Sequence, residues 1–493
     1  MTVDVILPLP LDQTYTYRVP AAMTEDAEVG RRVLVPFGPR RLTGLIVDTG
    51  PPVEELDVDF AVKPLLDVLD DAPAFTDEML RLTRWIADYY VCGWGEAAKA
   101  ALPSGTDVKT KRRIRRTDAP AGDWAAHEAA GPVLADLERH PETTLTALRR
   151  RVSGRVTLAL LRRLERDGLV TITETLGDPS VSAKTETHLR FAPAFRHDGA
   201  AEDLKAQLRG HKQKAVVETL AGLAAEGPME PRQAEVMERA EASYATIQSL
   251  IDKGMIEAVE KEVHRSPLDD LPDPGDPPDH ALHPAQQASL DAIAEAVAAR
   301  RYETFLLHGV TGSGKTEVYI AALKRVLAQG RTGIILVPEI ALTPQTVQRF
   351  RAHFGDRIAV LPSQMSMGAR YDAWRALREG RYAIAIGPRS AVLAPLENLG
   401  LIVVDEEHEH SYKQFDPAPR YHARDVAVMR AHMNGAVCVL GSATPGLESR
   451  MNAAWGKYTL LEMPERVPDS SGEAAYIGDQ PHGRLWRVNI SSS

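Results

Sequence analysis

Hydrophobic and polar positions follow two different patterns in the two halves of the chain. Near the N-terminus, residues 7–19 and 32–49 alternate apolar and polar side chains around turn-forming prolines and glycines, which is typical of half-buried β-strands. A helix rich in apolar positions is expected at Asp77–Tyr90. We therefore predict a small β-rich domain over residues 1–105.

Beyond residue 284, short apolar runs alternate with helical segments. Helices are expected at Lys315–Ala328 and Pro344–Phe354. The expected strands are residues 304–307, 333–337, 383–386, 401–404 and 436–440. Short apolar strands between helices are typical of a parallel sheet with helices on both faces. Residues 284–465 are therefore predicted to form an α/β lobe.

Two α+β units of the winged-helix type are predicted between these regions, at residues 126–203 and 204–266. Each has a helix that ends at a glycine, Gly168 or Gly254, before a strand of β-branched residues. Glycine suits the left-handed cap that ends a helix. The remaining stretches are predicted to be a basic linker at 106–125, an acidic, proline-rich linker at 267–283 and a disordered tail at 466–493.

Composition limits the class of protein. The 493 residues carry a net charge of −10, and 44% of them are apolar. The chain has no N-terminal signal pattern and no apolar run of the about 20 residues that span a bilayer. Its two cysteines exclude a disulfide framework and a multi-cysteine zinc site within the chain. A soluble, cytoplasmic protein that does not bind membranes is expected.

The uneven distribution of charge bears on possible partners. Net acidity argues against a surface that binds nucleic acid over the whole molecule. Residues 109–116, however, include six basic side chains, and further arginines lie between 149 and 166. A local basic surface can bind phosphates on an acidic protein. The arginine-rich helix at 155–166 is expected to contact the DNA backbone, with a solvated face or a protein-docking surface as the alternatives.

The strongest chemical motif is a glycine-rich loop that follows the strand expected at 304–307 and begins a helix. Its residues are Gly309, Val310, Thr311, Gly312, Ser313, Gly314, Lys315 and Thr316. Backbone N–H groups of such a loop surround phosphate oxygens. Lys315 is expected to reach the β- and γ-phosphates of ATP, and Thr316 to hold Mg²⁺ through its hydroxyl. The alternative is a chance match, because the pattern specifies few positions.

A second set of chemical residues follows the apolar strand at 401–404. Asp405 lies where a metal-holding carboxylate belongs, at the end of a central strand, and Glu406 is expected to orient the attacking water. Lys315, Asp405 and Glu406 are thus the candidate catalytic residues. Thr316 and Asp405 are the candidate Mg²⁺ ligands. The alternative is an acidic helix N-terminus favoured by the helix dipole.

The sequence DEEH at 405–408 resembles motif II of superfamily-2 helicases, whose nucleotide-binding lobe is RecA-like. Residues 284–450 closely resemble the PriA family of replication-restart helicases, with further matching motifs at 336–345, 387–391 and 441–445. The resemblance implies ATP-dependent 3′→5′ unwinding of DNA at stalled forks and reloading of the replisome, with ATP and Mg²⁺ as cofactors.

The same resemblance implies ligands and partners. The expected ligands are branched or fork DNA and single-stranded DNA. The expected protein partners are other primosome proteins, the single-stranded-DNA-binding protein and the machinery that loads the replicative helicase. A nucleoid-associated location in the cytoplasm would follow.

Roles of individual residues in the lobe also come from the resemblance. Arg389 and Ser390 are expected to touch the DNA backbone. Gln286 is expected to lie near the adenine, or alternatively to be a polar residue at a helix start. The residues expected to link the ATP site to DNA are His408, Ser442 and Thr444.

Segment 411–424 interleaves basic and aromatic residues, which suit single-stranded DNA through charge and base stacking. It is similar to the aromatic-rich loop that couples strand binding to hydrolysis in the family. The alternative is that these aromatic side chains pack the lobe. The candidate DNA-binding residues are Tyr412, Lys413, Phe415, Arg420, Tyr421 and Arg424.

Residues 1–105 resemble the family's domain that recognises a DNA 3′ end. Tyr15 and Lys63 match an aromatic residue and a lysine that line the 3′-end pocket, and are candidate DNA-binding residues. Thr16 stands where the family carries an acid, although a hydroxyl can also hydrogen-bond a terminal sugar. Alternatively, Tyr15 and Tyr17 are strand residues that face a core.

The family continues with a second RecA-like lobe, a zinc-binding insertion and a C-terminal domain, which are not recognisable in these 493 residues. Zinc, expected in the full-length family, therefore has no site in this chain. We expect the chain to bind ATP, Mg²⁺ and DNA but to hydrolyse ATP slowly and not to unwind DNA alone, because an arginine of the second lobe normally stabilises the transition state. The rival hypotheses are a non-catalytic fork-binding or single-strand-binding module and another superfamily-2 translocase.

Overall fold

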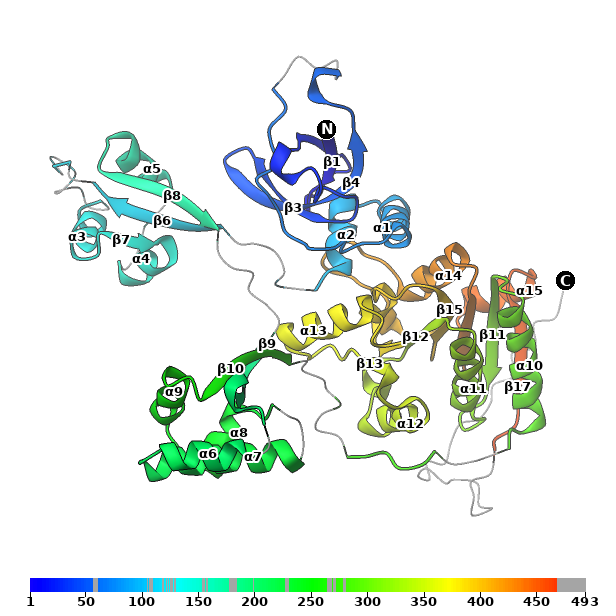
Figure 1. Cartoon of the computed structure of the whole chain (residues 1–493). Coiled ribbons are helices and arrows are strands. Elements are labelled where there is room, and N and C mark those ends of the chain that lie inside the picture. Colours follow the sequence, from blue (N-terminus) through cyan, green and yellow to red (C-terminus); the bar gives the residue numbers. More distant parts are fainter. Residues whose placement is uncertain are drawn as a thin grey trace.

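The structure, a computed structural model, describes the chain except for residues 56–60, 104, 106–109, 118, 121, 123, 125–126, 128–129, 153–155, 157, 177–183, 198, 227–229, 264–267, 269–271, 278–280 and 468–493. The tail expected at 466–493 lies outside the described residues from position 468 onward. Figure 1 shows the elements in chain order from blue to red. Among the described residues, no helix is long and apolar enough to cross a membrane.

The N-terminal domain is built on a five-stranded antiparallel sheet with the order β2-β1-β4-β3-β5. Its strands are β1 (Thr2–Ile6), β2 (Tyr15–Arg18), β3 (Arg32–Phe37), β4 (Arg40–Gly50) and β5 (Asp67–Val68). Two helices follow, α1 (Asp77–Tyr90) and α2 (Trp94–Ala101). The predicted β-rich domain is therefore found, and its predicted helix at 77–90 is confirmed.

The strand pattern expected at 7–19 is only partly correct. The structure has one strand before this segment and a second at its end, and residues 7–14 leave the sheet between them. Pro8 and Pro10 lack the N–H group that a sheet ladder requires, so pairing stops after Ile6. The alternation in the sequence did not reveal this break.

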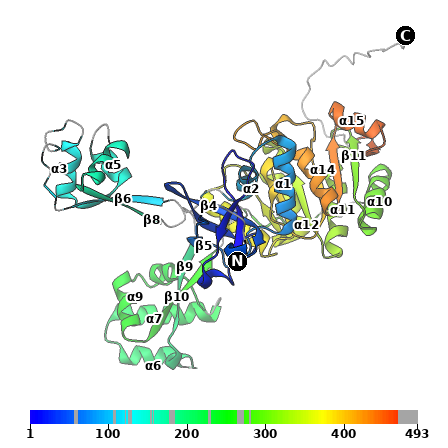
Figure 2. The same ribbon diagram turned by 90° about the horizontal axis from the view of Figure 1, so that it is seen from above.

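Two small units follow, and both views show them standing apart from the large sheet (Figures 1 and 2). The first has a three-stranded antiparallel sheet, β7-β6-β8, and the second has the antiparallel pair β9 and β10. The first contains β6 (Thr110–Arg116), α3 (Gly131–Arg139), β7 (Glu142–Thr144), α4 (Leu145–Arg151), α5 (Leu158–Arg166) and β8 (Val170–Leu176). The second contains β9 (Lys184–Phe191), α6 (Ala200–Gln207), α7 (His211–Glu226), α8 (Gln233–Arg239), α9 (Tyr244–Asp252) and β10 (Ile256–Val263).

Two of the predicted boundaries in this region are wrong. The basic residues at 110–116 are not a linker, because they form the central strand β6 and Ile114 is fully buried in the core of the first unit. The second unit begins at β9 and not at residue 204, because β9 pairs with β10 along its whole length. The linker was predicted from the high charge of the segment. The start of the second unit was misplaced because pairing between β9 and β10, which are far apart in the sequence, has no local signal.

The C-terminal lobe is a seven-stranded parallel sheet with the order β13-β14-β12-β15-β16-β11-β17. Its strands are β11 (Glu303–Gly309), β12 (Thr332–Leu336), β13 (Ile358–Val360), β14 (Ile384–Gly387), β15 (Leu399–Val404), β16 (Val437–Ser442) and β17 (Thr459–Met463). Its helices are α10 (Pro284–Ala298), α11 (Lys315–Ala328), α12 (Pro344–Phe354), α13 (Met367–Arg378), α14 (Ala423–Met433) and α15 (Leu447–Ala454). The helices predicted at 315–328 and 344–354 are confirmed.

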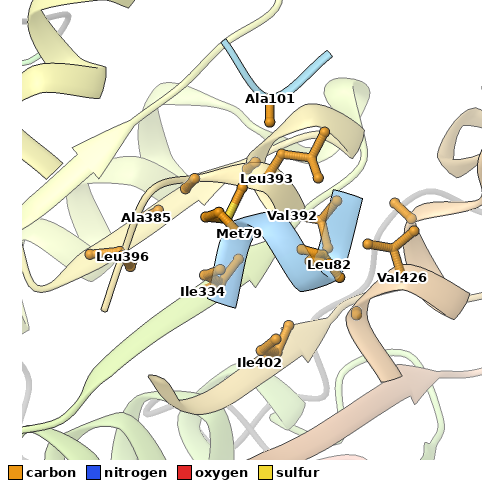
Figure 3. Packing of buried hydrophobic residues seen from close by; sticks show 14 of the residues in the cluster. Met79, Leu82, Ala101, Ile334, Ala385, Val392, Leu393, Leu396, Ile402 and Val426 are labelled. Atoms are coloured by element: carbon orange, nitrogen blue, oxygen red, sulfur yellow. The ribbon is translucent and has the colours of Figure 1, made fainter. Parts of the chain in front are cut away.

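The two faces of this sheet are covered by different helices. Successive residues of a strand point to opposite faces, so Ile334 packs with residues of α13 and α14, whereas Ile335 packs with residues of α10, α11 and α12. Helix α1 of the N-terminal domain joins the first group: Figure 3 shows Met79 and Leu82 among side chains of the lobe such as Ile402. The N-terminal domain and the lobe therefore share one hydrophobic core.

A buried ion pair reinforces this shared core. Arg430 of α14 is fully buried and donates from Nε and Nη2 to the carboxylate of Glu78 on α1, at 3.0 and 3.1 Å. Its Nη1 donates to the carbonyls of Val392 and Ala394 at 2.6 and 2.9 Å. Asn434 donates to the same carboxylate at 3.0 Å. The polar groups at this interface are thus paired, as burial requires.

Candidate nucleotide-binding site and the loop beside it

The glycine-rich loop connects β11 to α11 and has the backbone conformation that its glycines allow. Gly312 and Gly314 have φ angles of 81° and 76°, which disfavour any residue with a Cβ. Gly314 is the N-cap of α11, and Lys315 is the first residue of the helix. Backbone N–H groups at a helix N-terminus form a site for anions.

Two polar side chains of the loop are suited to receive phosphate oxygens. Ser313 is buried, and its Oγ has no hydrogen-bond partner within the described part of the chain. Lys315 is also buried, and its Nζ donates to the carbonyl of Gly309 at 2.8 Å. An unpaired buried hydroxyl costs stability unless a ligand uses it. The loop residues therefore fit a bound phosphate chain.

Asp405 lies at the same edge of the sheet as this loop. It directly follows β15, which is separated from β11 only by β16. Its carboxylate accepts a hydrogen bond from the hydroxyl of Tyr319 on α11 at 3.0 Å. Thr316 and Asp405 line the same pocket, which has a volume of about 270 Å³. The fold thus brings together the two motifs that are about 90 positions apart in the sequence.

The surroundings of Asp405 suit a cation. Burial, and next the negative charge of Glu406, raise the pKa of Asp405 from 3.8 to about 6. A divalent ion would offset both effects, and the hydroxyl of Thr316 supplies a second oxygen of the kind that Mg²⁺ prefers. In the described part of the chain, no cluster of three or more His, Cys, Asp or Glu could hold a metal ion by itself.

Glu406 and His408 continue the motif, and Glu406 has an unusual backbone conformation. Glu406 has a φ angle of 46°, in the left-handed region that residues with a Cβ rarely adopt. Such conformations persist where the surroundings hold them, often at functional sites. Nδ1 of His408 lies 3.6 Å from the Glu406 carboxylate and 2.8 Å from Oγ of Ser442. Oγ1 of Thr444 lies 3.4 Å from Nε2 of the same ring.

The third acidic residue of the motif is structural. Glu407 is fully buried, and its carboxylate accepts hydrogen bonds from the backbone N–H of Gly446 at 2.6 Å and the hydroxyl of Ser449 at 2.7 Å. It also forms an ion pair with Arg424 at 3.2 Å. Together with the His408 contacts, these bonds join segment 405–408 to the turn after β16.

Gln286, the residue expected near the adenine, lies at the start of helix α10 and contacts the phosphate loop. Its side chain is buried, with Nε2 donating to the carbonyl of Ser313 at 3.0 Å and Oε1 accepting from the N–H of His283 at 2.8 Å. Both ends of the amide are therefore used within the protein. The hydrogen bond to Ser313 holds Gln286 against the phosphate loop, and a role near the adenine stays a prediction.

Three of the residues predicted to bind DNA in segment 411–424 are held inside the lobe or in ion pairs. Tyr412 is fully buried, and its hydroxyl donates to the backbone carbonyl of Asp405 at 2.7 Å. Tyr421 is only 2% exposed, so its ring is unavailable to a base. Arg424 is engaged with Glu407 and with Asp425. For the two tyrosines the packing alternative fits the burial of their rings, whereas DNA contact by Arg424 stays a prediction.

Other residues of the segment remain accessible. Phe415 is 72% exposed and Arg420 is exposed, with Nε of Arg420 donating to the carbonyl of Phe415 at 2.9 Å. Nζ of Lys413 donates to the carbonyl of Arg420. Arg389 donates to the carbonyl of Lys413 at 3.0 Å, and Ser390 is exposed beside it. The structure therefore groups these five predicted residues around one loop.

The predicted residues of the N-terminal domain lie on or beside strand β2. Tyr15 is partly exposed and makes an edge-on contact with Phe37, at 5.1 Å between ring centroids. Lys63 is exposed, and its carbonyl accepts the N–H of Arg18 at 2.9 Å. Thr16 donates its hydroxyl to Asp4 at 2.6 Å. A carboxylate from β1 therefore lies next to the threonine.

Comparison with known proteins separates the chain into two recognised parts. Residues 4–103 match the family model described as the 3′DNA-binding domain of PriA, and residues 283–452 match the DEAD/DEAH box helicase model. The replication restart protein PriA of Bacillus subtilis is 36% identical over 463 residues, which cover 93% of this chain and 54% of that protein. The chain is similar to PriA over most of its own length. The PriA protein of Synechocystis sp. is also 36% identical, over 94% of this chain and 54% of its own length.

The extent of these matches is limited. The chain spans about half the length of these two PriA relatives, 54% in each case. Among solved structures, RecG bound to a three-way DNA junction is similar, with 19% identity over 55% of this chain and 32% of RecG at a TM-score of 0.31.

Three residues that matter in the geometry were given no role from the sequence. Tyr319 contacts Asp405, Glu407 anchors the turn after β16, and Tyr90 of α1 reaches the loop. Tyr319 carries a weak signal, since it lies four positions after Lys315 and so on the same side of the helix. The contact of Tyr90 joins segments that are more than 300 positions apart and had no signal in the sequence.

Proposed function

We propose that the chain carries the nucleotide-binding and DNA 3′-end-binding parts of a PriA-type helicase. The activity would be ATP-dependent 3′→5′ unwinding at stalled replication forks, with fork DNA and single-stranded DNA as ligands. Primosome proteins, the single-stranded-DNA-binding protein and the loading machinery of the replicative helicase are the partners that the relationship to PriA suggests.

The observation that carries this proposal is the meeting of two motifs at one edge of the parallel sheet. Tyr319, on the helix that begins at the phosphate loop, contacts Asp405, and Thr316 at the end of the loop lines a common pocket with Asp405. The match to the helicase family over 283–452 includes both motifs. A lobe with these features and a neighbouring 3′DNA-binding domain supports a DNA-dependent ATPase more strongly than a small-molecule kinase.

Each residue of the site has a distinct proposed task. Lys315 and the backbone N–H groups of the loop would hold the phosphates of ATP, and Thr316 and Asp405 would hold Mg²⁺. Bound Mg²⁺ would neutralise charge on the phosphate oxygens. Glu406 would orient the attacking water and accept its proton. The contacts of His408 with Ser442 and Thr444 would pass the state of this site to the turn after β16.

DNA would be held at two places. In the N-terminal domain, Tyr15, Thr16 and Lys63 would contact a 3′ end. In the lobe, Phe415 would stack on a base of the single strand. Arg420, Lys413, Arg389 and Ser390 would contribute charge or hydrogen bonds to phosphates around the same loop.

The proposal is tested by replacing the lysine of the phosphate loop. Lys315→Ala should weaken binding of a fluorescent ATP analogue with Mg²⁺ at least about tenfold, since it removes a charge-assisted bond to phosphate. The affinity for fork DNA should stay within about twofold. The matched control is Lys324→Ala, which removes an exposed lysine from the same helix. Equal nucleotide affinity in wild type and Lys315→Ala would refute the nucleotide site.

The rival hypothesis, a binding module without catalysis, makes a different prediction. In that case fork DNA would bind to the chain while ATP turnover stayed at background with and without DNA. A single-turnover measurement with excess chain over radiolabelled ATP detects slow hydrolysis. Hydrolysis that DNA accelerates and that Glu406→Gln abolishes supports the helicase assignment.

A further inference from the structure

The end of helix α1 reaches from the N-terminal domain to the loop beside the nucleotide site. The hydroxyl of Tyr90, the last residue of α1, accepts a hydrogen bond from the backbone N–H of His422 at 3.1 Å. It also lies 3.5 Å from the carboxylate of Asp425. Nζ of Lys413 lies 5.1 Å from the centre of the Tyr90 ring, in a cation–π contact. One side chain thus touches both ends of the loop.

The loop between these contacts, residues 413–422, is closed by its own hydrogen bonds. Lys413 and His422 form an isolated β-bridge, and the N–H of Gln414 donates to the carbonyl of Tyr421 at 2.9 Å. The amide of Gln414 donates to the carbonyls of Pro417 and Pro419, at 2.9 Å each. The exposed Phe415 and Arg420 are therefore carried on a compact unit whose base rests against Tyr90.

The same base is joined to the acidic motif. Arg424 lies two residues after His422 and donates to Asp425 at 3.1 Å and to Glu407 at 3.2 Å. Glu407 is fully buried, and its own N–H donates to the carbonyl of Gly441 at 3.0 Å. A contact series therefore runs from Tyr90 through Asp425 and Arg424 to Glu407, which is adjacent to Glu406 in the chain.

Helix α1 is held in place at its other end. The Glu78 carboxylate is bound by the buried Arg430, and Met79 and Leu82 pack in the core of the lobe. Because both ends of the helix are attached to the lobe, Tyr90 cannot shift without a change in this interface. The hydroxyl is thus at a defined place relative to the loop.

We propose that Tyr90 is a positioning residue through which the N-terminal DNA-binding domain sets the loop 413–422 and, through Arg424 and Glu407, the acidic segment of the nucleotide site. This inference rests on the proposed function, because it requires that the chain binds both DNA and ATP. Occupation of the DNA surfaces and of the nucleotide site should then favour the same arrangement of the loop. Two ligands that favour one arrangement raise each other's affinity by the same factor.

The test measures that factor with each ligand present or absent. The full chain is titrated with a fluorescent ATP analogue and Mg²⁺, with and without an oligothymidylate that carries a 3′-hydroxyl, and the reverse titration is made with labelled DNA. We expect a mutual enhancement of about tenfold in the wild type, within the usual range of coupling between sites. Tyr90→Phe keeps the ring and removes the hydroxyl. It should lower the factor to about twofold or less, while each ligand alone binds as in the wild type.

The matched control is Tyr89→Phe, which removes a hydroxyl from the neighbouring, 60% exposed tyrosine of the same helix. It should keep the wild-type factor. A second arm uses Arg424→Gln, which interrupts the series between the loop and Glu407. In that background Tyr90→Phe should cause no further loss, because contacts in one series are not additive.

The outcomes separate this inference from the proposed function. If the wild-type chain bound neither ligand, the proposed function itself would be contradicted. A chain that binds both ligands without mutual effect, or a Tyr90→Phe variant with the wild-type factor, would overturn the inference and leave the proposed function standing. A full additional loss from Tyr90→Phe in the Arg424→Gln background would also overturn it.

Discussion

At the scale of single residues, close packing and local charge decide what each position tolerates. Asp4 illustrates the effect of local charge. Its carboxylate accepts the hydroxyl of Thr16 across strands β1 and β2. A terminal 3′-hydroxyl of DNA is a hydrogen-bond donor, whereas a 3′-phosphate is an anion. A carboxylate at this place would favour the former and repel the latter.

We therefore predict that Asp4→Asn lowers the preference of the chain for a 3′-hydroxyl end over a 3′-phosphate end. Loss of a charged acceptor and of the repulsion together should reduce the ratio of the two affinities by about tenfold. The control is Asp71→Asn, which removes an exposed carboxylate of the same domain outside strands β1, β2 and β4. Competition binding with the two oligonucleotides measures the ratio. An unchanged ratio in Asp4→Asn would show that this carboxylate does not distinguish a 3′-hydroxyl from a 3′-phosphate.

Gly95 illustrates the effect of close packing. A Cβ at this position of α2 would lie 1.6 Å from the carbonyl oxygen of Leu7. The segment that leaves the sheet after β1 therefore passes directly against the helix. No side chain can be accommodated there unless the backbone moves.

Gly95→Ala should destabilise the N-terminal domain by about 2 kcal/mol or more, as overpacking does. Gly222→Ala is the comparison, because Gly222 lies within helix α7 and a Cβ there meets no atom within 4 Å. That change should instead stabilise its unit by up to about 1 kcal/mol through helix propensity. Urea denaturation followed by circular dichroism measures both. A neutral Gly95→Ala would contradict the close approach.

At the scale of elements, helix α1 has two roles. It completes the N-terminal domain and also covers part of one face of the lobe's sheet. Its ion pair with α14 is buried, and the loss of one partner would leave an unpaired charge beside unsatisfied carbonyls.

Arg430→Met should therefore destabilise the chain by about 3–5 kcal/mol. The control is Arg84→Met on helix α1, the helix that carries Glu78. This change removes the exposed ion pairs of Arg84 with Asp12 and Asp88. Exposed pairs contribute at most about 1 kcal/mol. The two variants are compared by the midpoint of thermal unfolding. If both variants lowered the midpoint of thermal unfolding by a similar amount, the buried ion pair would contribute no more to stability than the exposed ones.

At the scale of the whole molecule, the parts differ in how far they depend on one another. Within the part of the chain that the structure describes, the core of the second small unit is made of residues between positions 189 and 256. The core that includes one face of the large sheet also contains residues of the N-terminal domain, from Ile6 to Ala101. The N-terminal domain and the lobe should therefore unfold together, and the small unit separately.

Expression of two fragments tests this prediction. Residues 184–263 should give a dispersed NMR spectrum and cooperative unfolding, because their core is self-contained. Residues 281–467 without the N-terminal domain should aggregate or bind a hydrophobic dye, because the face normally covered by Met79 and Leu82 becomes exposed. A stable, monomeric lobe fragment that binds no dye would contradict a shared core.

Local patterns in the sequence were enough for much of the lobe. The helices at 315–328 and 344–354 and the strand–loop–helix around Lys315 follow from periodicity and from glycine chemistry, because these signals act over a few neighbouring residues. For the same reason the position of Asp405 at the end of its strand could be predicted. Two features were not predicted. The apolar and polar alternation at 7–19 suggested a continuous strand although prolines break it after Ile6, and the high charge of 110–116 suggested a linker although this segment pairs as a strand.

Contacts between distant segments were settled only by folding. Whether Tyr412 and Tyr421 face a base or the interior depends on which elements pack beneath them, and the same aromatic spacing is compatible with both. Likewise, neither Tyr90 nor Glu407 carries a local mark of its partners. Burial and ion pairing depend on the three-dimensional neighbours of a residue, whereas helix, strand and phosphate-loop formation depend mainly on its neighbours along the chain.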